Sequence, residues 1–175
     1  MVLKRQFTMI EPLPIPPDII VALHFISATP PLFHWMLYVQ SNVEDGFKFH
    51  ATQTNNRNFV YEKASFTLCS SRRISAAAVV GRLNTHTLCD LHNILKRIPV
   101  NIIPHVDIAR EPQFSCRVWV REAVRRLHAE GFLDCPDVDA LEQEMWHYGR
   151  ISASEIRRGV FTKATLYTAL SARAT

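Results

Sequence analysis

The hydrophobic positions in the first half of the chain have the spacing and composition of β-strands. Apolar runs rich in β-branched and aromatic residues occur at 19–27, 32–40, 47–53, 59–68 and 76–83. Turn residues separate these runs: the prolines at 30 and 31, "SNVEDG" at 41–46 and "NNRN" at 55–58. Runs of this length between turn signals predict strands that pair in chain order. The first half therefore predicts an antiparallel sheet of about five strands.

The second half of the chain changes to the helical period. Leucines and isoleucines recur at helical spacing within 85–98, and further helices are predicted from Cys116 to about residue 130 and over 135–149. Gly131 and Gly149 are the expected helix ends. Strands followed by helices indicate an α+β fold with the helices packed on one face of the sheet. We expect one domain over residues 1–149, with a proline-rich lead-in, and a helical or partly disordered extension over 150–175.

Composition narrows the function classes. The 175 residues are 47% apolar and 21% charged, which is typical of a globular domain, and five glycines form no phosphate-binding loop motif. The formal net charge is +4, and part of it comes from arginines at 117, 121 and 125, which are spaced by four and predict a solvated helix face. Without a basic-aromatic stripe, this charge does not indicate a nucleic-acid partner.

The cysteines and the N-terminus bear on the compartment. The four cysteines form no CxxC pair, so a zinc ribbon is not expected. Prolines and acidic residues interrupt the first 20 residues, and no run reaches the roughly 18 apolar residues that a membrane span needs. We therefore expect a cytoplasmic protein with reduced thiols, no membrane span and no cofactor. Cys69, Cys89 and Cys135 are interpreted as structural.

Cys116 occupies a special place in the predicted helix. It shares the apolar face with Val120 and Val124 and lies in the first turn, after a plausible N-cap at Ser115. The positive end of the helix dipole favours a thiolate at this position, and free backbone amides there suit an oxyanion. A cysteine on an apolar face is also a common core residue. A catalytic role therefore requires a base nearby.

Two histidines on neighbouring strands are the candidate base and its partner. His34 lies in "FHWMLYV" and His50 lies in "FKFHATQ". If residue 36 pairs with residue 50, both imidazoles lie on one face of the sheet and are diagonal neighbours. A slip of one residue would separate them across the sheet. In the first register, a base, an orienting group and a thiol are available for acyl transfer.

The order "FHWMLYV … FKFHA … FSCRVWV" resembles the permuted papain-like proteins of the NlpC-type superfamily, which include lecithin:retinol acyltransferase. The resemblance implies a circularly permuted papain-like fold with Cys116 as nucleophile, His34 as general base and His50 as orienting residue. The family's Asn-Cys-Glu-His is replaced here by Ser115-Cys116-Arg117-Val118. The patterns "HWMLYV", "CRVWV" and "CPDVDAL" also look similar to small fungal proteins, which by analogy suggests a role in secondary metabolism.

The main hypothesis is a thiol-dependent hydrolase or acyltransferase that acts on a small-molecule or acyl substrate. A catalytically inactive binding or scaffold module on the same fold is one alternative, and a cyclase or isomerase that uses the same pocket is another. A further interpretation is a zinc site with His34, His50 and Cys116 as ligands, although neither a carboxylate nor a pattern of residues that would orient these ligands supports a metal site. Trp35, Tyr38 and Trp119, with Trp146, are candidates for an aromatic substrate pocket or for the core.

Overall fold

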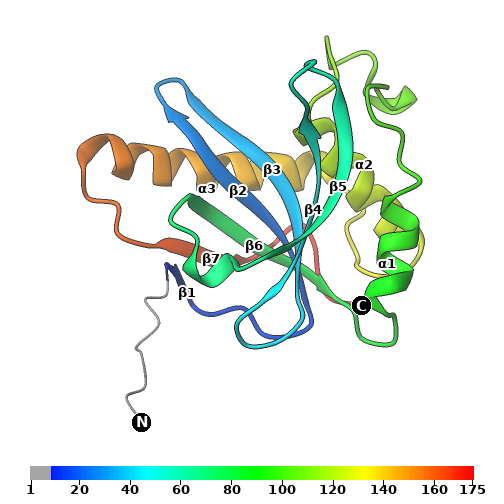
Figure 1. Ribbon diagram of the computed structural model, residues 1–175, viewed down its shortest axis with the longest axis horizontal. Coiled ribbons are helices and arrows are strands. Elements are labelled where there is room, and N and C mark those ends of the chain that lie inside the picture. Colours follow the sequence, from blue (N-terminus) through cyan, green and yellow to red (C-terminus); the bar gives the residue numbers. More distant parts are fainter. Residues whose placement is uncertain (1–8) are drawn as a thin grey trace.

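The computed structural model describes residues 9–175, so residues 1–8 of the expected domain lie outside the described part of the chain. One mixed seven-stranded sheet and three α-helices make up the fold, in agreement with the α+β prediction (Figure 1). The strands are β1 (Ile10–Glu11), β2 (Asp18–Ala28), β3 (Pro31–Gln40), β4 (Gly46–Gln53), β5 (Phe59–Phe66), β6 (Ile74–Arg82) and β7 (Ala164–Thr168). The helices are α1 (Leu88–Leu95), α2 (Cys116–Ala129) and α3 (Val138–Arg158).

The five predicted strands correspond to β2 to β6. Strands β2 to β5 pair in chain order as an antiparallel meander. β6 does not continue this meander, because it pairs with the outer side of β2. The strand order is β1-β7-β6-β2-β3-β4-β5, which places β2 and β3 in the middle of the sheet.

The prediction of an antiparallel sheet of about five strands is wrong at one edge. β7 lies between β1 and β6 and runs parallel to both. β1 has two residues and β7 has five, so neither segment is long enough to show a clear alternation. Their pairing joins the two ends of the described chain, a contact that local patterns do not reveal.

The predicted end of the last helix at Gly149 is also wrong. α3 continues to Arg158 and ends at Gly159, which adopts the left-handed conformation that suits a helix terminus. Gly149 is buried within α3, where a Cβ atom would come within 3 Å of Phe33 and Leu23. This glycine therefore permits close approach of the helix to the sheet. The tail from residue 150 provides the end of α3 and strand β7, and the expected domain boundary falls inside a helix.

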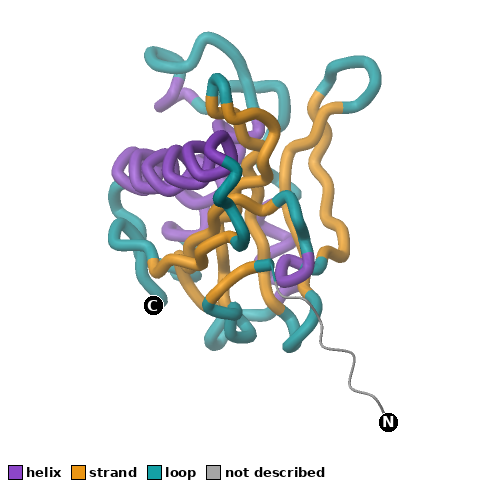
Figure 2. Tube along the Cα trace, turned by 90° about the vertical axis from the view of Figure 1, so that its left-hand side faces the viewer, coloured by secondary structure: helices purple, strands orange, loops and turns teal. Residues whose placement is uncertain are grey.

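The helices gather on one side of the sheet, as predicted (Figure 2). The larger apolar cluster combines that face of β2, β3, β4 and β6 with side chains of all three helices. A smaller cluster on the opposite face contains Met36 and Tyr38 of β3 with Ile10, Leu68 and Leu166. The loop between α1 and α2 contains the 3-10 turn His105–Asp107 and no strand. Within residues 9–175, none of the helices combines the length and apolar character required to cross a bilayer.

Candidate active site

The register between β3 and β4 places the two candidate histidines on one face. The ladder pairs Leu37 with Phe49 and continues to Gln40 and Gly46, and the same register extended by one step would pair residue 36 with residue 50. This is the register in which His34 and His50 share a face. The ladder stops at Leu37, and the β2–β3 and β4–β5 hairpins diverge beyond it (Figure 1). The two histidines face each other where the strands separate.

The imidazoles of His34 and His50 are in direct contact. The Nε2 atom of His34 lies 2.5 Å from the Nδ1 atom of His50, and the rings meet edge to face. His50 is buried, with 4% of its surface exposed, and His34 is partly buried. Because Nε2 of His34 reaches a side chain on β4, the His34 ring extends across the gap between the two strands.

The environment keeps both imidazoles neutral near pH 7. Burial, followed by the neighbouring imidazole of His50, lowers the pKa of His34 to about 4. Burial and the ammonium group of Lys48 lower the pKa of His50 to about 4, although the carboxylate of Glu62 opposes this shift. A neutral imidazole has a free lone pair, so His34 is in the protonation state that a general base requires.

The thiol of Cys116 reaches the same gap from the helix side. Cys116 is the first residue of α2, and the side chain of Ser115 caps the helix as predicted, accepting a hydrogen bond from the Val118 N–H at 3.3 Å. The Sγ atom accepts a hydrogen bond from the backbone N–H of Trp35 at 3.4 Å. This N–H therefore points away from β2, into the space where β3 has left β4. The Sγ atom of Cys116 therefore contacts the backbone of Trp35, the residue that follows His34.

Burial raises the pKa of the Cys116 thiol above its ordinary value. The backbone N–H groups of Trp35, Arg117 and Cys116 and the charge of Arg117 lower it, but they do not outweigh burial. Among residues 9–175, no hydrogen bond joins Sγ to either imidazole or occupies Nδ1 of His34. The resting site thus contains a neutral thiol at the backbone of Trp35 and a neutral imidazole pair.

The carboxylate of Glu62, which the sequence analysis did not identify, lies close to the His34–His50 pair. Glu62 on β5 is the cross-strand partner of His50, and its Oε1 atom lies 3.7 Å from His50 Nε2. The same oxygen lies 3.6 Å from Nζ of Lys48. The ends of the two predicted strands, at 53 and 59, contained the necessary signal, because an antiparallel hairpin that pairs residue 53 with residue 59 also pairs residue 50 with residue 62.

The candidate substrate-binding aromatics do not form one pocket. Trp35 and Trp119 are buried in the larger apolar cluster, where Trp35 contacts Trp146 and Trp119 contacts Tyr61. Tyr38 lies on the opposite face of the sheet, where its hydroxyl donates to the Gln40 side chain. These side chains are mainly core. Trp119 also lines a small hollow of about 290 Å³ between α2 and the preceding loop.

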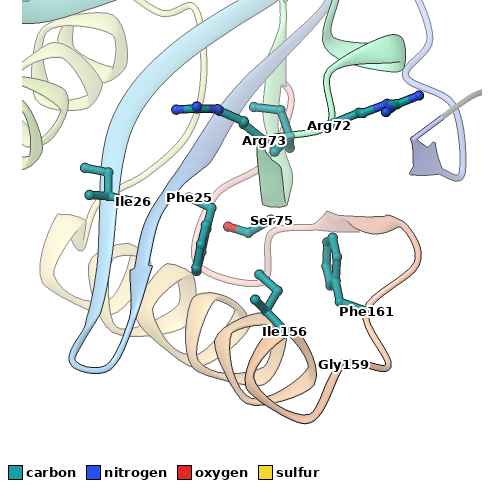
Figure 3. Close-up of a pocket in the computed structure, with 9 residues that line it drawn as sticks. Phe25, Ile26, Arg72, Arg73, Ser75, Ile156, Gly159 and Phe161 are labelled. Carbon is teal, nitrogen blue, oxygen red and sulfur yellow. The ribbon is translucent and has the colours of Figure 1, made fainter.

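A larger pocket of about 470 Å³ lies beside the start of β6 and the end of α3 (Figure 3). Phe25, Ile156 and Phe161 supply apolar walls, and the guanidinium groups of Arg72 and Arg73 extend away from the hollow in different directions. None of Cys116, His34 and His50 lines this pocket. Phe25, which lines this pocket, follows His24, the cross-strand partner of His34.

The prediction of a solvated arginine face on α2 is wrong. Arg121 is 3% exposed, and its guanidinium binds the carboxylates of Asp107, Asp139 and Glu142. The same carboxylates also bind the guanidinium groups of Arg110, Arg117 and Arg125. The acidic residues come from the preceding loop and from α3, so their match to this helix face was not evident from spacing alone. The network anchors the loop and α3 to the helix that carries Cys116.

The metal interpretation finds no ligand set in the described part of the chain. Within residues 9–175, no group of three or more His, Cys, Asp and Glu side chains has a metal-binding arrangement. His34, His50 and Cys116 therefore do not come together as ligands, although two of them touch. All four cysteines are free thiols.

Comparisons with known proteins give one match. Residues 21–134 match the model of a family of unknown function (DUF6540), a stretch that begins within β2, extends beyond the end of α2 and includes His34, His50 and Cys116. The chain belongs to this family. No curated protein and no solved structure matches the chain.

Proposed function

We propose that this member of the DUF6540 family is a thiol-dependent hydrolase or acyltransferase in which Cys116 is the nucleophile, His34 the general base and His50 the orienting residue. The observation that carries the proposal is the 2.5 Å contact between the two imidazoles, located where the Cys116 thiol meets the β3 backbone. A base held by a second polar side chain, next to a thiol at a helix N-terminus, is the arrangement that nucleophilic acyl transfer requires.

The proposed reaction begins with attack of Sγ on the carbonyl carbon of an ester, thioester or amide. As the S–C bond forms, the thiol proton moves to Nδ1 of His34, and the carbonyl oxygen becomes an oxyanion. Collapse of this intermediate breaks the bond to the leaving group, which takes the proton from His34. Water, an alcohol or an amine then attacks the thioester by the same steps in reverse and restores the thiol.

The start of α2 supplies donors for the oxyanion. The first backbone N–H groups of a helix have no partner within the helix. Ser115 caps the amide of Val118, which leaves the amides of Cys116 and Arg117 beside the thiol. Donors placed at the developing charge commonly provide a large part of the catalysis of acyl transfer.

The protonation states favour a general-base mechanism over a preformed thiolate–imidazolium pair. Burial raises the pKa of Cys116 and lowers that of His34, so the ion pair is disfavoured before substrate binds. Proton transfer then accompanies attack on the carbonyl, as it does with a serine nucleophile. The free thiols are consistent with a reducing compartment such as the cytoplasm.

The arrangement also agrees with what the NlpC-type resemblance implies. In the proteins of that superfamily, a histidine lies at the start of one strand, a second histidine lies on the next strand, and the cysteine is at the start of a helix. Here β3 carries His34, β4 carries His50 and α2 begins at Cys116. We therefore include a permuted papain-like fold in the proposal.

A catalytically inactive binding module is the second candidate, and the burial of Cys116 favours it. A thiol whose pKa is raised by burial is ordinarily an unreactive core residue. This candidate predicts that no acyl group is transferred to Cys116.

Acyl-enzyme trapping separates the two candidates. The protein is mixed with 4-nitrophenyl esters and acyl thioesters of several chain lengths, quenched in acid and analysed by peptide mass spectrometry. We expect the mass of one acyl group on the peptide that contains Cys116, and no such mass at this position in Cys116→Ala. Absence of acylation at Cys116 with every ester and thioester would support the inactive module.

A further inference from the structure

The outer nitrogen of His50 faces a carboxylate that the proposed reaction does not use. His50 Nε2 is buried and, among the described residues, has no hydrogen-bond partner within normal distance. Oε1 of Glu62 lies 3.7 Å from this nitrogen, and among the described residues it is the carboxylate oxygen that pairs with His50. A buried ring nitrogen ordinarily has a partner, so the relation between His50 and Glu62 requires an explanation.

The contact between the histidines is compatible with two proton arrangements. In the first, Nε2 of His34 carries the proton and donates to Nδ1 of His50, whose own proton is then on Nε2. In the second, Nδ1 of His50 donates to Nε2 of His34, and the His34 proton is on Nδ1. Both neutral arrangements satisfy the same 2.5 Å contact.

Only the first arrangement leaves His34 able to act as base. Its Nδ1 atom then has a free lone pair, which can take the thiol proton. In the second arrangement this nitrogen already carries a proton, and a neutral thiol beside it has no acceptor. The choice of tautomer therefore decides whether the site is active.

We infer that Glu62 is a positioning residue that selects the productive tautomer of the His34–His50 pair; this inference rests on the function proposed above. In the first arrangement, the N–H of His50 Nε2 points at the carboxylate of Glu62, which attracts it. In the second, a lone pair at the same nitrogen faces that carboxylate, which is repulsive. Partial burial strengthens the difference, because the effective dielectric constant is lower than in water.

The charged groups around the pair modulate this preference. Lys48 Nζ shares the oxygen of Glu62 at 3.6 Å and therefore competes with His50 for it. His24 on β2 and Lys48 both disfavour a positive charge on the histidines, and Arg73 acts on His24 in the same sense. Among these neighbours, Glu62 is the anion that can hold a proton on the outer nitrogen of His50.

The test is nitrogen NMR of the histidine side chains at pH 7, where both imidazoles are neutral. Correlations between ring nitrogens and carbon-bound protons distinguish Nε2–H from Nδ1–H tautomers. We expect the wild type to hold His34 and His50 as Nε2–H, and Glu62→Gln to shift the pair toward Nδ1–H. Glu44→Gln, which alters an exposed carboxylate in the β3–β4 turn, is the matched control and leaves both tautomers unchanged.

Acylation of Cys116 by a 4-nitrophenyl ester gives the functional readout. Glu62→Gln is expected to slow it about tenfold, and Glu62→Asp to restore part of the rate. The inference is overturned if Glu62→Gln leaves the tautomers of both histidines as they are in the wild type. If the tautomers shift but Cys116 of the wild type is never acylated, tautomer selection by Glu62 is supported and the proposed function fails. If Cys116 is acylated and the Glu62 variants match the wild type in tautomer and rate, the proposed function stands without Glu62.

Discussion

The Nε2 atom of His34 lies 2.5 Å from Nδ1 of His50, although the ladder between their strands ends before it reaches either residue. The register alone would make the two side chains diagonal neighbours, and the separation of β3 from β4 gives the His34 ring room to extend toward β4. The same separation exposes the backbone N–H of Trp35, which holds the Cys116 thiol. One local divergence of two strands thus permits both contacts, that between the two imidazoles and that of the Cys116 thiol with the backbone of the residue after His34.

The first prediction concerns stability against pH. The pKa of His34 and that of His50 are both lowered to about 4, from the ordinary value of 6.5. Between pH 4 and pH 6.5 the unfolded chain binds more protons than the folded one. The free energy of unfolding therefore decreases as the pH falls from about 6.5 to about 4. We expect His34→Gln to reduce this decrease, measured as the free energy of unfolding in urea at several pH values. The exposed His147→Gln is the control, and an equal pH dependence in all three proteins would contradict the burial of the pair.

The second prediction concerns the state of the thiol. Iodoacetamide reacts with thiolate that is already present, and burial raises the pKa of Cys116. We expect Cys116 to be alkylated at pH 7 at least about tenfold more slowly than the exposed Cys89 of the same chain. Peptide mass spectrometry at a series of times gives both rates. Faster labelling of Cys116 than of Cys89 would instead indicate a preformed ion pair with His34.

The third prediction tests the close approach of α3 to the sheet. Alanine is a better helix former than glycine by about 1 kcal/mol, so an exposed Gly→Ala change within a helix is stabilising. At Gly149, a Cβ atom would lie 2.8 Å from Phe33 and 2.9 Å from Leu23. We expect Gly149→Ala to destabilise the protein by about 1–2 kcal/mol in urea unfolding, because overpacking exceeds the gain in helix propensity. A net stabilisation would mean that α3 does not pack against these side chains.

The fourth prediction concerns the ion pairs that hold α2. Arg121→Met would remove the buried guanidinium that three carboxylates share and leave Asp107 and Glu142 with fewer partners. We expect a loss of about 3 kcal/mol in the free energy of unfolding. The matched control is Arg126→Met, which breaks an exposed pair with Glu122 and is expected to cost less than about 1 kcal/mol. Similar effects of the two substitutions would show that the buried network does not stabilise the fold.

Local patterns were sufficient to predict the central strands and most of the helix positions. Alternation and turn residues located β2 to β6, and helical spacing with Ser115 located the start of α2 at Cys116. The turn between β3 and β4 left two registers open to the sequence, and the structure has the one that places His34 and His50 on one face. These features depend on neighbours in the sequence, which explains why a single chain revealed them.

The features that the sequence did not predict depend on distant contacts. β7 is too short to be recognised and pairs with strands far away in the chain. Gly149 looked like a helix end because nothing local indicated that Phe33 and Leu23 pack against it. The arginines of α2 looked solvated because their partners lie in a loop and on another helix. The contact of Cys116 with the Trp35 backbone likewise depends on the divergence of β3 and β4.

The rate of Cys116 acylation relative to Cys89, in the wild type and in His34→Gln, tests the central claim most directly. Both thiols meet the same 4-nitrophenyl ester in the same tube at pH 7, so Cys89 serves as an internal standard. If His34 activates the thiol, the half-buried Cys116 is acylated faster than the exposed Cys89, and His34→Gln lowers the ratio by about 10²-fold or more. If Cys116 is slower than Cys89 in the wild type, and the ratio is unchanged in His34→Gln, then His34 is not its base and the acyl-transfer account is contradicted.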